Sequence, residues 1–215
     1  ASYRVRIYTP RQELPFAGHP SVGSAHAALE SGLATAHDGK LVQECTAGLL
    51  PMRIEGEGHE RRIFVRAPKG RVVEATFDSR LLEAALAGLP RGQLSPVIID
   101  NGPRWWLVEL ADDAAVRTMQ PDMAAIAALT LASDAVGLAV FGGCSDQDHD
   151  VVVRAFCPAD GIPEDPVTGS ANAAIAAWLH GNEALPAQRY RASQGREMGR
   201  DGVVEVEVDD EGEVW

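Results

Sequence analysis

Two stretches of similar design decide how this chain folds: AGHPSVGSAHAAL at residues 17–29 and TGSANAAIAAW at residues 168–178. Each places a glycine immediately before a predicted helix made largely of small apolar residues. A helix that is apolar on nearly all sides is usually buried, so we expect each helix to lie inside a sheet that wraps it. Two helices of this kind predict a pair of pseudo-symmetric domains.

Short predicted strands surround both helices, which we place at 20–30 and 170–180. The first group of strands covers residues 4–8, 41–45, 49–54 and 62–66. The second group covers residues 97–99, 105–110, 136–141, 151–156, 190–193 and 203–208. Further helices are expected at 79–87 and 121–132. Strands that follow one another with few βαβ crossovers predict the α+β class.

The segment GLPRG at residues 88–92 has the composition of a linker, and the pattern partly restarts after it. We therefore predict two domains, at residues 1–90 and 91–215. The chain begins and ends inside predicted strands, although natural ends usually trail off in polar residues. We expect residues to be missing at both ends.

The composition excludes several classes of partner. A formal net charge of −12 and the lack of a Lys/Arg-rich run argue against nucleic acid. Three cysteines without C-x-x-C spacing suggest no disulfide framework. No apolar stretch is long enough for a bilayer, and the start alternates like a strand where a signal peptide would be continuously apolar. These features predict a cytoplasmic protein without a membrane partner.

The two glycine-to-helix junctions suit the binding of a small anion. The first turn of a helix has unpaired backbone N–H groups and a partial positive charge, and Gly18 and Gly169 would let a ligand approach the backbone. Either junction alone also fits an ordinary tight turn, with Pro20 and Ser170 as common helix-start residues. Because both buried helices begin in the same way, we favour a shared anion-binding role.

Two residues near the junctions are candidates for acid–base chemistry. His19 lies at a helix start, whose partial positive charge favours the neutral, proton-accepting imidazole. A lone histidine is often structural, and the other histidines have no comparable context. Asp165 precedes Pro166, which holds it extended in a rigid turn, although an acidic residue there also suits capping of the next helix.

The residue spacing excludes two other kinds of site. The sequence around Ser170 lacks the G-x-S-x-G turn of serine hydrolases. The histidines and cysteines lack the spacing of a metal site, so we expect no metal.

Three longer motifs resemble the PhzF family of phenazine biosynthesis. They are RIYTP at residues 6–10, ELPFAGHP at 13–20 and EDPVTGSA at 164–171, with a weaker match in QGREMGR at 194–200. The resemblance implies a fold like diaminopimelate epimerase, with a curled, mostly antiparallel sheet, or open barrel, around a central helix in each domain. It also implies an isomerase that uses no cofactor and moves a proton within a small carboxylate substrate in the interdomain cleft. A homodimer is a further expectation.

The resemblance assigns roles by position. His19 matches the family's active-site histidine, Asp165 the aspartate that contacts the substrate, and Ser170 the serine that helps to hold its carboxylate. Gly18, Gly169 and Ala171 complete the expected substrate-binding set. The family's general base is a glutamate upstream of the first matching strand, so this chain contains no residue that matches it. The last strand of the first domain is also expected to be missing.

Two other functions stay open beside the isomerase. One is an amino-acid epimerase or racemase of the same fold, which is less favoured because Gly18 and Gly169 replace the two catalytic cysteines of such enzymes. The other is a non-catalytic small-molecule binding protein with the same cleft. The motifs do not select a substrate, since specificity depends on the shape of the pocket.

Overall fold

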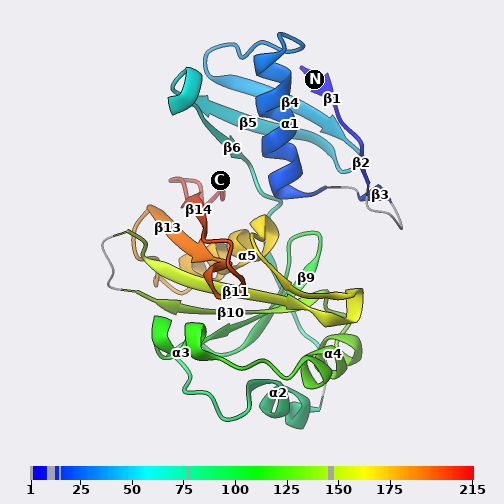
Figure 1. Ribbon diagram of the computed structural model, residues 1–215, viewed down its shortest axis with the longest axis vertical. Coiled ribbons are helices and arrows are strands. Elements are labelled where there is room, and N and C mark those ends of the chain that lie inside the picture. Colours follow the sequence, from blue (N-terminus) through cyan, green and yellow to red (C-terminus); the bar gives the residue numbers. More distant parts are fainter. Residues whose placement is uncertain (1, 9–12, 15, 77, 145–147) are drawn as a thin grey trace. The chain divides into compact units, whose positions relative to one another are not determined.

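The computed structural model describes residues 2–8, 13–14, 16–76, 78–144 and 148–215 (Figure 1). Residues 9, 10 and 15 of the motifs that resemble the PhzF family lie outside these ranges. The chain divides into two compact units: one contains the residues up to Ala67 together with Trp215, and the other contains Pro68–Val214. The described residues include no helix that is long and apolar enough to cross a membrane.

The first unit is a four-stranded sheet with one long helix, α1, across it (Figure 1). The strands are β1 (Tyr3–Arg4), β4 (Lys40–Cys45), β5 (Gly48–Glu55) and β6 (Arg62–Val65), in that order. β1 runs parallel to β4, and the other neighbours are antiparallel. β2 (Ile7–Tyr8) and β3 (Glu13–Leu14) form a separate pair, so the strand expected at 4–8 is divided between two sheets.

Helix α1 covers Gly18–Glu30 and packs on the sheet through small side chains. Its buried residues Ala25 and Ala28 contact a core that includes Leu41 and Met52. The other side of α1 is exposed, because this sheet covers one side of the helix. The sequence suggested a helix buried all round, and α1 differs from that expectation.

The second unit is built on an eight-stranded sheet whose main order is β14-β13-β11-β10-β9-β8-β7, with β12 paired to β11. The strands are β7 (Arg71–Val73), β8 (Val97–Asp100), β9 (Arg104–Glu109), β10 (Gly137–Gly143), β11 (Val151–Cys157), β12 (Ile162–Asp165), β13 (Arg189–Gln194) and β14 (Gly202–Glu207). The helices are α2 (Ser79–Leu86), α3 (Asp113–Thr118), α4 (Met123–Ala132) and α5 (Gly169–Gly181). Short 3-10 turns occur at Gly58–Glu60 in the first unit and at Pro158–Asp160 and Arg196–Met198 in the second.

Helices cover both faces of the second sheet (Figure 1). α2, α3 and α4 pack on one face, where Trp106, Leu138 and Val152 belong to their core. α5 lies on the other face, toward which Trp105 points because neighbouring side chains of a strand alternate. The central strands β10 and β11 are therefore buried along nearly their whole length.

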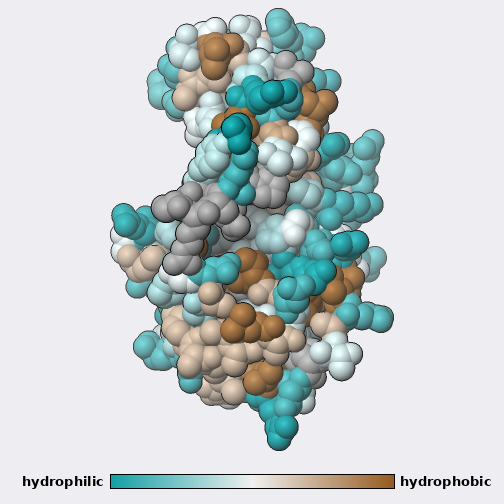
Figure 2. Space-filling view, turned by 90° about the vertical axis from the view of Figure 1, so that its right-hand side faces the viewer, coloured by the Kyte–Doolittle hydropathy of each residue, from teal (hydrophilic) through white to brown (hydrophobic). Residues whose placement is uncertain are grey.

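Helix α4 is apolar on all sides but is only partly buried. Ile126 and Leu129 are fully covered, whereas Leu131 is 72% exposed. Apolar surface is visible on this side of the second unit in Figure 2. Most of the exposed residues of α4 are alanines, whose small side chains make this exposure inexpensive.

The division between the two compact units follows Ala67, which is earlier in the chain than the predicted boundary between residues 90 and 91. β7 pairs with β8, and α2 buries Leu82 and Leu86 in the core of the second unit. The segment at residues 88–92 that suggested a linker directly follows the end of α2. Ala87 and Gly88 end this helix in the left-handed conformation, with φ 47° and φ 73°. Its composition reflects the end of a helix.

A buried glutamine occupies the same place in each unit. Gln43 lies on β4 and Gln194 on β13, and each strand has one parallel and one antiparallel neighbour. Gln43 donates to Ser21 Oγ at 2.9 Å, and Gln194 accepts from Asn172 Nδ2 at 2.9 Å. Ser21 and Asn172 are the fourth residues of α1 and α5. The pseudo-symmetry expected from the sequence therefore extends to a hydrogen bond behind each helix start.

Candidate active site

Four of the six predicted site residues flank the turn between β12 and α5. β12 pairs with β11 up to Asp165, and α5 begins at Gly169. The Asp165 carboxylate accepts a hydrogen bond from the Thr168 hydroxyl, with 2.7 Å between Thr168 Oγ1 and Asp165 Oδ2. The partner of Asp165 Oδ2 is thus a side-chain hydroxyl and not a backbone N–H of α5.

A buried ion pair fixes the strand that leads into this turn. Arg154 Nε and Nη2 donate to the two carboxylate oxygens of Glu164 at 2.8 and 2.9 Å. Arg154 Nη1 also donates to the carbonyl of Met119 at 2.7 Å, which ties the pair to the end of α3. Glu164 of the EDPVTGSA motif therefore anchors β12 to β11.

Ser170, in the first turn of α5, accepts hydrogen bonds from one residue of strand β9 and from one residue of the loop between β8 and β9. The indole nitrogen of Trp105 donates to Ser170 Oγ at 3.1 Å, and Asn101 Nδ2 donates to the Ser170 carbonyl at 2.8 Å. Ser170 Oγ donates no hydrogen bond to the residues that the structure describes, so its proton is available to a ligand. Asn101 Oδ1 is buried without a hydrogen-bond partner among the residues that the structure describes.

The predicted site residues are divided between the two units. Asp165, Gly169, Ser170 and Ala171 lie close together around the start of α5, and the Ala171 side chain is fully buried. His19 lies in the second position of α1 and is exposed to solvent within the first unit, and Gly18 precedes it. The sequence reasoning missed Trp105 and Asn101, which lie more than sixty positions from Ser170 and belong to no shared motif.

No cysteine among the described residues lies at the start of an α-helix. Cys157 is at the end of β11, where burial and the nearby carboxylates of Asp165 and Asp160 raise its pKa from 9.0 to about 12. A thiol with such a pKa is protonated at neutral pH and is a poor nucleophile.

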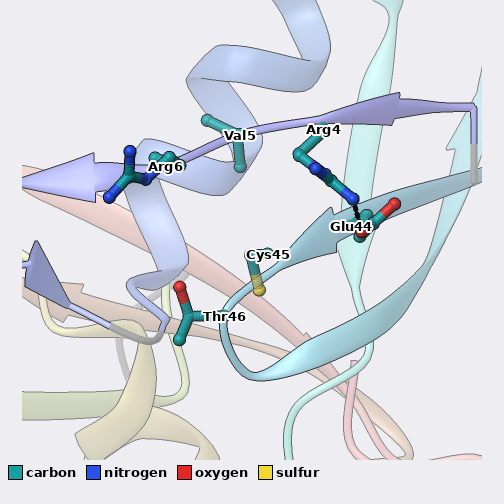
Figure 3. Close-up of a pocket in the computed structure, with 6 residues that line it drawn as sticks. All are labelled: Arg4, Val5, Arg6, Glu44, Cys45 and Thr46. Carbon is teal, nitrogen blue, oxygen red and sulfur yellow. Dashed lines mark hydrogen bonds and ion pairs between the residues drawn. The ribbon is translucent and has the colours of Figure 1, made fainter.

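The first unit contains a small hollow of about 250 Å³ (Figure 3). It is lined by Arg4, Val5, Arg6, Glu44, Cys45 and Thr46. Arg4 pairs with Glu44, and Arg6 pairs with Glu13 at 2.7 Å. Both cations are therefore neutralised, and the hollow contains none of the predicted site residues.

The α+β arrangement of helices and sheets is that of the epimerase-like fold, which solved structures of PhzF proteins and of a hydroxyproline epimerase share. Residues 1–214 match the PhzC-PhzF family, described as phenazine biosynthesis-like protein, and the chain belongs to this family. The family and the fold class predicted from the sequence are confirmed.

Two relatives show the level of similarity. Antisense-enhancing sequence 1 of Schizosaccharomyces pombe is 33% identical, over 97% of this chain and 72% of that protein. The trans-2,3-dihydro-3-hydroxyanthranilate isomerase of Pseudomonas aeruginosa is 33% identical, over 92% of this chain and 67% of that enzyme. Other relatives are also named isomerases, and the chain is an isomerase of this family.

The fold itself is close to that of a Bacillus anthracis PhzF-family protein. The two structures have a TM-score of 0.77 and 24% sequence identity, over 98% of this chain and 74% of that one.

Proposed function

We propose that this isomerase moves a proton within a small carboxylate-bearing substrate by acid–base chemistry, without a cofactor. The observation that carries the proposal is the start of α5, where Asp165 and Ser170 are each held by a specific hydrogen bond. The name of the Pseudomonas relative gives a substrate of this class, a hydroxylated amino carboxylate.

The start of α5 supplies the groups that a carboxylate needs. α5 has 13 residues, and the partial positive charge of its first turn favours an anion. Trp105 donates to Ser170 Oγ, and the Ser170 hydroxyl proton, which has no acceptor among the described residues, can be donated to a carboxylate oxygen. Gly169 precedes Ser170 without a side chain that would block the approach to the backbone.

We assign roles in the proton transfer to residues of this chain from the family resemblance. A proton leaves a carbon next to the unsaturated system and returns to another carbon of the same molecule, so no oxidant or reductant is consumed. Asp165 and His19 orient polar groups and shape the path of the proton. In the family that the motifs resemble, the base is a glutamate that lies before the first matching strand, and we assign the same role to that residue type in the complete protein. A well-placed acid or base contributes roughly 10²- to 10⁴-fold in rate.

The test is proton exchange by the complete protein with trans-2,3-dihydro-3-hydroxyanthranilate in deuterated water, followed by NMR. We expect deuterium in the product, with kcat lowered about 10²- to 10⁴-fold in Asp165→Asn and His19→Gln. Ser170→Ala should act mainly on KM. Exchange at the normal rate in Asp165→Asn would contradict the assignment.

The same exchange measurement, repeated with amino acids as substrates and accompanied by a binding assay, separates the two alternatives. An epimerase or racemase would exchange a proton at one stereocentre of an amino acid and return it to the same carbon. The raised pKa of Cys157 and the glycines at positions 18 and 169 argue against two-cysteine chemistry of that kind. A binding protein would bind the carboxylate without exchange.

A further inference from the structure

We propose that Gln194 is a positioning residue that sets the orientation of the Asp165 carboxylate through the Thr168 hydroxyl. The inference rests on the proposed function, in which Asp165 contacts the substrate. Gln194 begins the QGREMGR segment, which resembles the family only weakly and has no role in the site described above.

All four hydrogen bonds that the Gln194 amide can make go to the turn between β12 and α5 or to α5 itself. Gln194 is 1% exposed. Its Oε1 accepts from the Thr168 backbone N–H at 3.0 Å and from Asn172 Nδ2 at 2.9 Å. Its Nε2 donates to the Asp165 carbonyl at 2.9 Å and to Thr168 Oγ1 at 2.8 Å. A primary amide has two donor hydrogens and two acceptor lone pairs, so the group is saturated.

Two backbone groups fix which way round the amide lies. The Thr168 N–H can only donate and the Asp165 carbonyl can only accept, so a flipped amide would bring donor against donor and acceptor against acceptor. Nε2 must therefore face Thr168 Oγ1, whose own proton has to point elsewhere. It points to Asp165 Oδ2, 2.7 Å away. The hydrogen bonds run in one direction from Gln194 through Thr168 to Asp165.

Glycines beside Gln194 allow the turn to come this close. Gly195 has φ +90°, and a Cβ there would lie 2.5 Å from the Pro166 carbonyl oxygen. Gly202, which is paired with Gln194 across β13 and β14, would place a Cβ 2.5 Å from Val167 Cγ2. The segment after Gln194 is thus shaped to receive the turn that carries Asp165.

The consequence is that one oxygen of the Asp165 carboxylate is occupied in a defined direction. The Thr168 hydroxyl holds Oδ2, and no other hydrogen bond to this carboxylate comes from the residues that the structure describes. Oδ1 is left for the substrate. Without the hydroxyl the carboxylate can rotate, and misplacement of a reacting group by about 1 Å can cost 10²-fold in rate.

The first test compares Thr168→Val, which removes the hydroxyl and keeps the shape, with Thr168→Ser, which keeps the hydroxyl. The matched control is Thr130→Val, because Thr130 is also buried, and among the described residues its hydroxyl donates to the carbonyl of Ala127 in its own helix α4. In the complete protein we expect Thr168→Val to lower kcat about 10- to 100-fold with KM changed by less than about threefold. Thr168→Ser should restore most of kcat, and Thr130→Val should leave both constants unchanged.

A second variant, Gln194→Glu, reverses the direction of the hydrogen bonds. The introduced carboxylate still accepts from the Thr168 N–H but offers no donor to Thr168 Oγ1, so it draws the hydroxyl proton away from Asp165. We expect a loss of kcat similar to that of Thr168→Val and little further loss in the double variant, because both changes act through one hydroxyl. Fully additive losses would contradict the inference. If Gln194→Glu does not fold, Thr168→Val decides.

A crystal structure of Thr168→Val gives a result that needs no turnover. We expect the Asp165 carboxylate to rotate or to occupy two orientations, and a single unchanged orientation would overturn the inference. Equal kcat values for Thr168→Val and Thr130→Val would overturn it as well. Absence of exchange in the unmodified protein would instead count against the proposed function, so the two failures are distinguishable.

Discussion

The indole nitrogen of Trp105 lies 3.1 Å from the hydroxyl oxygen of Ser170, at the first turn of α5. The next residue, Trp106, makes the equivalent bond on the opposite face of the sheet, to Ser133 Oγ at 2.8 Å. The two tryptophans are both buried, and they differ in which hydroxyl they hold. Substitutions of these two tryptophans therefore test whether the orientation of the Ser170 hydroxyl affects substrate binding.

We expect Trp105→Phe to raise KM by about 2- to 10-fold with little change in kcat, because a hydrogen bond of this kind contributes roughly 0.5–1.5 kcal/mol and Ser170 acts in binding. Steady-state kinetics of the isomerase measures both constants. Trp106→Phe serves as the control, since it should destabilise the fold without a change in KM. Identical kinetics for the two variants would count against the role of Trp105.

The buried pair of Arg154 and Glu164 should contribute to stability mainly because each charge compensates the other. Arg154→Met leaves the Glu164 charge buried without its partner, which costs about 3–5 kcal/mol. We expect the double variant Arg154→Met with Glu164→Leu to be less destabilised than the sum of the single variants. Urea unfolding followed by circular dichroism gives the free energies. Strict additivity would show that the two charges do not act together.

The three cysteines should differ in reactivity. Cys157 is 6% exposed and has a pKa raised to about 12, whereas Cys45 and Cys144 are partly exposed. A rise from 9.0 to about 12 lowers the thiolate population at pH 8 by about 1,000-fold. Iodoacetamide followed by peptide mass spectrometry should find Cys157 unmodified in the native protein and modified in urea. Rapid native modification of Cys157 would be inconsistent with its burial.

Stability should fall at alkaline pH. Burial raises the pKa of Cys157 and of Tyr190, so the folded protein keeps protons that the unfolded chain releases. The contribution of Cys157 is complete below about pH 9, its ordinary pKa, and is lost as the pH rises toward 12. The slope for one such group is about 1.4 kcal/mol per pH unit. Urea titrations between pH 7.5 and 10.5 should show a smaller decline for Cys157→Ala, and an equal decline would contradict this assignment.

Tyr190→Phe tests the loss of stability at alkaline pH at a second buried group. The Tyr190 hydroxyl is buried and has no hydrogen-bond partner among the described residues. Its removal should leave the free energy of unfolding at pH 7 unchanged or raised, because a buried unpaired hydroxyl is costly. Above pH 10 the variant should lose less stability than the unmodified protein. A loss of several kcal/mol at pH 7 would point to an unrecognised partner of the hydroxyl.

Local patterns predicted most of the regular structure. The runs of small apolar residues gave α1 and α5 to within two residues, since a helix of this composition has few other stable environments. Helix α3, at Asp113–Thr118, was missed because six residues are too few for a helical period. β12 was missed because Pro163 lies within it, and proline argues against a strand.

The site was predictable only where it is local in sequence. Asp165, Gly169 and Ser170 share one motif, and their neighbourhood follows from a single turn. The contacts of Ser170 with Asn101 and Trp105, and that of Thr168 with Gln194, join residues between 26 and 69 positions apart. Such contacts depend on the pairing of strands across the sheet, which short motifs do not report.

The matching positions of Gln43 and Gln194 have a consequence for how such proteins diversify. Each glutamine forms a hydrogen bond with the fourth residue of its helix. The two residues before that position differ, and they are His19 and Pro20 in one half and Ser170 and Ala171 in the other. Anchorage and reactivity are thus assigned to different residues. The leading residues of either helix can therefore change without loss of the glutamine contact that holds the helix on its sheet.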